Sequence, residues 1–184
     1  MKRKILISLI AAAICNIVFC IGIYAWDYQY EISNFIGYKQ QKDSWCWVAC
    51  AETSAKHESP SSNKGQAMAV YYVKGSFINE GGNMYDVEKA AEYISNGVDY
   101  YPSFAIGPSE SLVSSVLRNH ITILGIYNYD GNYYHTLALK GVYYSSKTPY
   151  LYTYDPWDGM YSLSSYRSYC DGSGDDWRES CSVK

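Results

Sequence analysis

The stretch QQKDSWCWVACAE, residues 40–52, places a glutamine six positions before a cysteine that opens an apolar, alanine-rich run. The run predicts a helix from about Cys46 to Lys56, with Ser44 as its N-cap. A cysteine at a helix N-terminus lies beside the positive end of the helix dipole, which stabilises the thiolate. Cys46 is therefore a candidate nucleophile, and Gln40 is a candidate donor to the oxyanion of a reacting carbonyl.

Two later segments carry the other groups that a reactive thiol needs. His135 stands at the head of the apolar run Tyr134–Leu139, and Asp155 opens an Asp-Pro-Trp motif. Because a free thiol has a pKa of about 8.5, it is only slightly ionised at neutral pH, and a neighbouring imidazole must take its proton. A carboxylate then fixes the orientation of the imidazole. The candidate site consists of Gln40, Cys46, His135 and Asp155.

The sequence around these residues resembles the bacterial papain-like cysteine peptidases. That group includes the staphopains, plant-targeted effector proteases and, more distantly, the double-glycine leader peptidases of bacteriocin exporters. The resemblance rests on a Gln-x5-Cys-Trp-x-Ala block, a histidine before alternating apolar residues, and an Asp-Pro-Trp-x-Gly block. It covers about residues 36–160, and it includes Tyr71–Gly75 and Asn79–Gly82, which are similar to the family's second helix and its glycine-rich turn.

The resemblance implies a papain-like fold and a cysteine-type peptidase that acts on a peptide or protein substrate. It implies no metal and no organic cofactor. The chain departs from the family pattern beside His135. Tyr133 and Tyr134 stand where small residues are common, and Thr136 stands where alanine is common. These departures keep every catalytic atom but change the expected shape of the cleft.

Other residues compete for two of the four roles. Gln41 is the rival of Gln40, although the spacing of six favours Gln40. Among the histidines, His57 lies in a polar loop and His120 at a helix end, where a cation is favoured in any case. We therefore prefer His135 as the base.

The remaining alternatives concern Asp155 and the second cysteine of the helix. An aspartate before proline is also a common turn residue, so Asp155 has a purely structural interpretation. Cys50 lies one helical turn after Cys46 and is expected to be a buried core residue. The alternative is a Cys46–Cys50 disulfide, which would block catalysis and act as a redox switch.

Composition bounds the class of protein. The 184 residues carry a formal net charge of −3 and no basic stripe, so nucleic-acid binding is not expected. The 22 tyrosines suit strands and recognition surfaces. Their concentration after residue 98 indicates a β-rich C-terminal half.

Hydrophobic periodicity predicts an α+β fold, with a helical N-terminal half packed on a C-terminal antiparallel sheet. After an extended segment at residues 27–39, the central nucleophile helix is followed by three more helices. The period then changes to that of strands. The further helices are expected at Gln66–Val73, Met84–Ser95 and Ser109–Arg118, and the strands at Ile121–Tyr127, Tyr133–Tyr144 and Tyr150–Tyr154.

The N-terminal segment indicates export. A basic start is followed by the apolar run 5–25, which is longer than a typical signal h-region and long enough to span a membrane. Residues 1–26 are therefore a signal peptide or an N-terminal membrane anchor. In either case the domain is expected outside the cytoplasmic membrane, with membrane contact only through residues 5–25.

The C-terminal segment is expected to be a tail. The peptidase domain would span residues 27–169, and residues 170–184 would form a polar tail rich in glycine, serine and aspartate. Outside the cytoplasm, Cys170 and Cys181 are expected to form a disulfide that ties this tail down.

The expected function is that of an exported cysteine peptidase. One alternative is a cell-wall amidase or endopeptidase, or a transglutaminase-like acyl transferase, on a similar triad. Another is a catalytically silent, tyrosine-rich binding module on the surface. Since only a short segment separates the apolar run from Gln40, no folded pro-domain is expected there. An inhibitor or activator protein, or oxidation, would then restrain activity.

Overall fold

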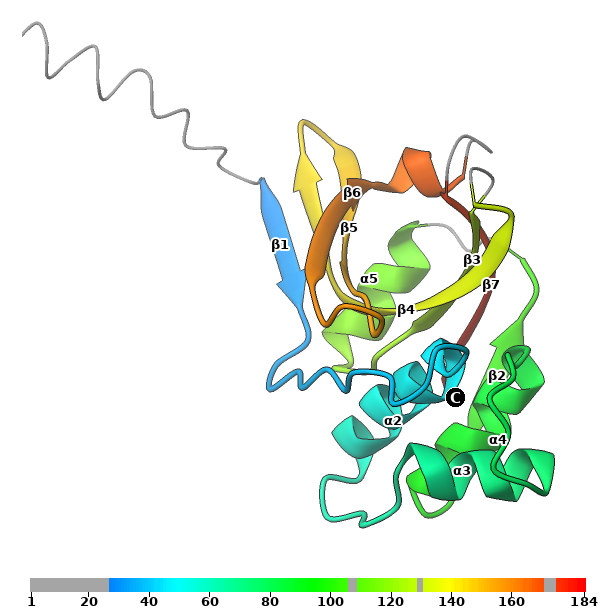
Figure 1. The fold of residues 1–184 in the computed structure, drawn as a ribbon. Coiled ribbons are helices and arrows are strands. Elements are labelled where there is room, and N and C mark those ends of the chain that lie inside the picture. Colours follow the sequence, from blue (N-terminus) through cyan, green and yellow to red (C-terminus); the bar gives the residue numbers. More distant parts are fainter. Residues whose placement is uncertain (1–26, 106–108, 129–130, 171–174) are drawn as a thin grey trace, which may run out of the picture.

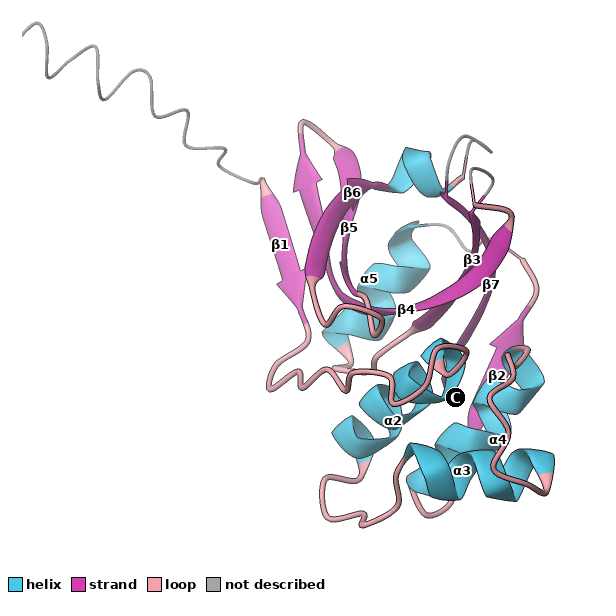
Figure 2. Ribbon diagram, viewed as in Figure 1, coloured by secondary structure: helices cyan, strands magenta, loops and turns pink. Residues whose placement is uncertain are grey.

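The computed structural model describes residues 27–105, 109–128, 131–170 and 175–184. Helices α2, α3 and α4 gather on one side of the molecule, and a strongly curved sheet lies on the other (Figures 1 and 2). Helix α5 stands apart from them and packs against strands β4 and β1. The four helices agree with the predicted ones to within two residues at either end. They are α2 (Cys46–Glu58), α3 (Gln66–Lys74), α4 (Met84–Ile94) and α5 (Ser109–Leu117), with a short 3-10 helix, η1 (Tyr166–Tyr169).

The strands form one antiparallel sheet of seven, in the order β2-β7-β3-β4-β5-β6, with β1 paired to β4. The long strand β4 pairs with β3 along its first half and with β5 along its second. Helices first and an antiparallel sheet second confirm the predicted α+β class. The strands are β1 (Tyr28–Glu31), β2 (Tyr100–Ser103), β3 (Ile123–Asn128), β4 (Tyr133–Ser145), β5 (Thr148–Tyr154), β6 (Tyr161–Ser165) and β7 (Asp175–Val183).

Helix α2 forms the centre of the domain. Every residue from Trp47 to Ala55 is buried, because α3 and α4 cover the helix on one side and β4 on the other. A helix that is enclosed in this way needs small, apolar side chains, which its alanines provide. Its N-cap is Trp45, without a side-chain capping bond, so the predicted cap at Ser44 is wrong. The Ser44 N–H instead donates to Asn79.

The glycine-rich turn after α3 is fastened to the start of α2. The indole N–H of Trp45 donates to the carbonyl of Ile78, and that of Trp47 donates to the carbonyl of Glu80. Gly82 lies directly on the Trp47 ring, where a Cβ would come within 2.5 Å of ring carbon. The two tryptophans that flank the cysteine therefore hold this turn beside it.

The C-terminal segment corrects the sequence-based expectation. Residues 175–183 form strand β7, which lies inside the sheet between β2 and β3. Trp177 and Cys181 on this strand are fully buried. The expected polar tail at 170–184 is therefore wrong for this stretch, because long-range strand pairing places it in the core. The domain extends past the expected boundary at residue 169.

The expected Cys170–Cys181 disulfide is not formed either, since Cys181 is a free thiol. On β7, Cys181 pairs with Ile123 of β3 on one side and with Pro102 of β2 on the other. Burial raises the pKa of its thiol to about 12. This cysteine is a core residue of the sheet.

The expected signal peptide or anchor at residues 1–26 lies outside the described residues. In the part of the chain that the structure describes, no helix combines the length and the apolar character that crossing a membrane requires.

Candidate active site

Three of the four predicted site residues converge where the helical layer meets the sheet. Cys46 is the first residue of α2, His135 lies near the start of β4, and Asp155 directly follows β5. Because β4 and β5 are antiparallel neighbours, the start of β4 and the end of β5 lie side by side at the same end of the sheet. The Nε2 atom of His135 lies 2.8 Å from Oδ1 of Asp155.

The imidazole connects the carboxylate to the thiol. Its Nε2 is engaged with Asp155, and the ring also hydrogen-bonds to the thiol of Cys46. The nitrogen that remains for the sulfur is Nδ1. Burial lowers the pKa of His135, but the hydrogen bonds to Asp155 and Cys46 outweigh it and raise the pKa to about 10.

The pKa of the Cys46 thiol shifts in the opposite direction, downward. Burial raises the pKa of Cys46, but the hydrogen bond and charge of His135, together with hydrogen bonds from Thr136, bring that pKa below its usual value. Burial likewise raises the pKa of Asp155, and the His135 contact outweighs this and lowers it. These directions favour a thiolate–imidazolium pair held by an ionised carboxylate.

A tight turn holds Asp155 in place. Its Oδ1 accepts a second hydrogen bond, 2.8 Å long, from the backbone N–H of Trp157. The backbone of the turn is closed by bonds from the Gly159 N–H to the Asp155 carbonyl and from the Asp155 N–H to the Met160 carbonyl. Asp155 thus stands at a turn, and the same turn aims its carboxylate at His135.

Gln40 occupies a different position from the one expected. Its side-chain nitrogen donates to the carbonyls of Lys42 and Asp43, at 2.9 Å each, while its buried Oε1 has no hydrogen-bond partner among the residues that the structure describes. Both amide hydrogens therefore brace the loop that leads into Cys46. In this arrangement neither is available to an oxyanion, so the donor role of Gln40 stays a prediction. The rival Gln41 uses its backbone N–H to bond Gln66.

The competing histidines lie at the far end of α2. Both interact near its C-terminus, where His57 bonds Asn119 and His120 pairs with Glu58. At 1.5 Å per residue, eleven residues of helix separate His57 from Cys46 by about 17 Å. Neither histidine reaches the thiol.

Cys50 is the buried core residue that the sequence predicted. Its thiol donates to the Thr136 carbonyl at 3.3 Å, and burial raises its pKa well above the usual value. Cys46 and Cys50 are both free thiols, so the alternative disulfide is not formed here.

A cavity of about 570 Å³ opens onto the sulfur and the imidazole. Three of its aromatic side chains are more than half exposed: Tyr133 (51%), Tyr134 (69%) and Trp157 (57%). The sequence predicted that Tyr133 and Tyr134 shape the cleft, whereas the place of Trp157 in its lining follows from the structure. The residues that line it are Asp43, Ser44, Cys46, Gly81, Tyr133, Tyr134, His135, Asp155 and Trp157.

Comparison with known proteins supports the fold. No protein-family model matches the sequence, and neither does any curated protein. Among solved structures, the chain is similar to a C39-like peptidase from Bacillus anthracis, with a TM-score of 0.59 and 13% identity over 86% of this chain and 98% of that one. A structure from a study of the mite allergens Blo t 1 and Der p 1 gives a TM-score of 0.60 and 11% identity, over 89% and 73%.

Digestive procathepsin L 3 of Tenebrio molitor gives a TM-score of 0.54 with 12% identity, over 87% of this chain and 70% of that one. At these identities the likeness concerns the fold. The chain thus has the α+β fold of the papain-like cysteine peptidases.

Proposed function

We propose that the protein is an exported cysteine peptidase that hydrolyses peptide bonds through a Cys46 thiolate. The observation that carries the proposal is the chain of contacts from Cys46 through His135 to Asp155, with the Nε2–Oδ1 distance of 2.8 Å, in a papain-like fold. Three separate segments, namely the start of α2, the start of β4 and the turn after β5, are needed to build this chain of contacts beside an open cleft, which a purely structural histidine would not require.

The reaction follows from the positions of these groups. The Cys46 sulfur attacks the peptide carbonyl carbon, and the carbonyl π electrons move to oxygen. The imidazolium of His135 then gives its proton to the leaving nitrogen, the C–N bond breaks and a thioester forms. His135 next takes a proton from water, whose oxygen attacks the thioester carbon. The acid is released and the sulfur returns as thiolate.

The oxyanion is stabilised by the start of helix α2. As the first residue of the helix, Cys46 has a backbone N–H without an intrahelical acceptor. Within the described part of the chain no side chain caps this end of the helix, and because Cys46 lines the cleft, the positive end of the dipole lies there. A second donor is needed, and Gln40 would fill this role only after releasing a carbonyl of its own loop.

Covalent labelling tests the proposal. The protein is incubated under reducing conditions with an epoxysuccinyl inhibitor of thiol proteases, and the adduct is mapped by mass spectrometry. We expect one adduct on Cys46, lost in the His135→Ala variant. A folded protein that gives no adduct would refute the peptidase proposal.

Product analysis separates the proposal from its enzymatic rivals. Release of peptides from an unstructured protein such as casein supports a peptidase. Release of cell-wall fragments instead, or amide transfer without hydrolysis, would assign the site to an amidase or a transglutaminase-like enzyme. Export is tested separately by fractionating cells and adding an external protease to intact cells.

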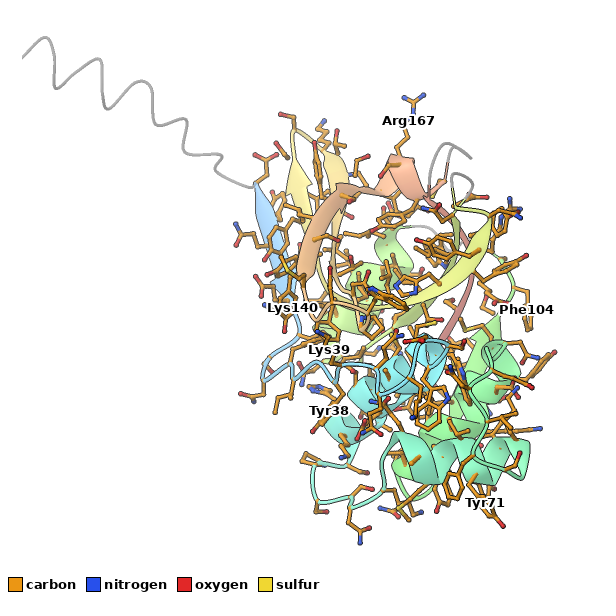
Figure 3. The ribbon with its side chains drawn as sticks, viewed as in Figure 1. Tyr38, Lys39, Tyr71, Phe104, Lys140 and Arg167 are labelled. Atoms are coloured by element: carbon orange, nitrogen blue, oxygen red, sulfur yellow. The ribbon has the colours of Figure 1, made fainter. Side chains whose placement is uncertain are left out.

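One observation favours the binding-module alternative. The helical side exposes aromatic side chains away from the cleft, and Figure 3 shows Tyr71 and Phe104 at its outer edge. They form pairs: Tyr71 with Phe77 at a ring distance of 5.0 Å, and Tyr85 with Phe104 at 5.2 Å. Two results together would support this alternative. The Cys46→Ala variant would bind a partner as tightly as the wild-type protein does, and the wild-type protein would show no thiol reactivity.

A further inference from the structure

Thr136 provides the Cys46 sulfur with a contact that the imidazole does not supply. Its Oγ1 lies 3.8 Å from Sγ, within hydrogen-bond range for sulfur, and its backbone also hydrogen-bonds to Cys46. We propose that the Thr136 hydroxyl donates a hydrogen bond to the Cys46 thiolate and so helps to keep the nucleophile ionised. This proposal rests on the proposed function, because both require Cys46 to react as a thiolate.

The hydroxyl is placed so that the sulfur is its partner. Thr136 is only 5% exposed, and among the described residues its Oγ1 makes no hydrogen bond other than the one to Cys46. A buried hydroxyl without a partner is costly, so the sulfur satisfies this group. While the thiol is protonated it can donate to Oγ1. Once the thiol has lost its proton, only the hydroxyl can donate, and the bond gains the strength of a charged acceptor.

Thr136 favours different protonation states for the two cysteines of α2. Its carbonyl oxygen accepts from Cys50 at 3.3 Å, and that bond needs the Cys50 proton. Its hydroxyl faces Cys46, where a proton on sulfur is dispensable. One residue of β4 therefore favours the thiol at one position of the helix and the thiolate one turn earlier.

The Thr136 hydroxyl matters for the ionisation of Cys46 because few groups offset the effect of burial on this thiol. Burial opposes ionisation of this thiol, and the groups that act against burial are His135 and Thr136. A valine in place of Thr136 keeps the branched shape but removes the donor. In this variant only the imidazole and the backbone of residue 136 counteract the rise in the Cys46 pKa that burial causes, so the thiol should ionise at higher pH.

The test measures the rate at which iodoacetamide alkylates Cys46 in the full-length protein as a function of pH, with the adduct located by mass spectrometry. Thr136→Val is compared with wild type, and Thr136→Ala with Thr136→Ser, a pair that differs by the hydroxyl alone. Thr153→Val is the control, since it removes another fully buried hydroxyl, one that bonds Ser162 instead of the sulfur.

We expect Thr136→Val to move the alkylation profile about one pH unit upward, which slows the reaction about tenfold on its acidic side. Thr136→Ala should shift in the same way relative to Thr136→Ser, and Thr153→Val should match wild type. Superimposable profiles for valine and threonine, or for alanine and serine, would overturn the proposal. If the valine variant does not fold, the alanine–serine pair decides.

The same data separate this inference from the proposed function. An ordinary thiol profile in the wild-type protein would refute both. A low wild-type profile that the Thr136 variants leave unchanged would overturn only the role of Thr136.

Discussion

His135 and Asp155, twenty positions apart in the sequence, are joined across two adjacent strands by a 2.8 Å contact from Nε2 to Oδ1. The contact leaves the other ring nitrogen for Cys46. It also fixes the ring through a carboxylate oxygen, Oδ1, that accepts a second hydrogen bond from the backbone N–H of Trp157. The orientation of the base is thus set by the β4–β5 hairpin and its following turn.

Replacing Asp155 with asparagine should weaken turnover without abolishing it. Asparagine preserves the size of the side chain and can accept from Trp157, but it removes the charge that stabilises the imidazolium. We expect kcat/KM to fall between about tenfold and a thousandfold, whereas Cys46→Ala should leave no measurable turnover. Steady-state kinetics on a peptide substrate measure both. Equal, complete losses would mean that Asp155 does more than orient the base.

The rate should fall as the pH rises toward 10. His135 has its pKa raised to about 10, so above this value the imidazole lacks the proton that the leaving nitrogen needs. On the acidic side, the lowered pKa of Cys46 should keep the enzyme active below the pKa of an ordinary thiol. The pH profile of kcat/KM shows both limbs. An alkaline limb near 6 to 7 would contradict the paired state.

The same group should make stability depend on pH. The folded pKa of His135, about 10, lies above the unfolded value near 6.5, so its contribution to stability is complete below 6.5 and is lost as the pH rises to 10. The difference in unfolding free energy between wild type and His135→Asn should therefore shrink over this range. Urea unfolding at several pH values measures it, and a constant difference would contradict the raised pKa.

Gly82 and Gly81 form a matched pair of positions. A Cβ at Gly82 would lie 2.5 Å from the ring of Trp47, so Gly82→Ala should destabilise the protein by about 1–3 kcal/mol. At Gly81 a Cβ meets nothing within 4 Å, yet this residue lines the cleft. Gly81→Ala should keep the melting temperature and change KM. If Gly81→Ala lowered the melting temperature and Gly82→Ala changed only KM, the described position of this turn would be contradicted.

The exposed aromatic side chains of the cleft should govern the choice of substrate. The lining contains tyrosines, a tryptophan and two carboxylates but no lysine or arginine, so it suits apolar or basic side chains better than acidic ones. Tyr134→Ala should lower kcat/KM for peptides with aromatic residues near the scissile bond. Tyr72→Ala, which removes an exposed tyrosine stacked on Tyr93 of the helical side, is the control.

Strand β7 should be indispensable for folding. Trp177 is almost completely buried, so Trp177→Ala should cost about 3–5 kcal/mol. A chain that stops at residue 174 should not fold, because β2 would lose its partner strand and β3 would lose one of its two partners. Circular dichroism and thermal unfolding check both variants. A stable truncated protein would restore the expectation of a dispensable tail.

Much of the fold follows from local patterns. The helical period of Met84–Ile94 and the apolar run after His135 predicted their elements to within two residues, because these signals arise from neighbouring side chains. The order of Cys46, His135 and Asp155 also indicated a site, since their chemistry is complementary. Their convergence needed only one hairpin and one helix packed on it.

Three findings needed the tertiary structure. The polar stretch 175–183 becomes a central strand because its pairing partners, β2 and β3, lie far away in the chain, and no local period reveals such partners. Gln40 binds its own loop, and the Thr136 hydroxyl reaches the sulfur of Cys46. The sequence by itself determined which chemical groups are present and in what order. The tertiary structure decided which of them hydrogen-bond to one another, because a buried polar side chain takes the partners that packing brings within reach.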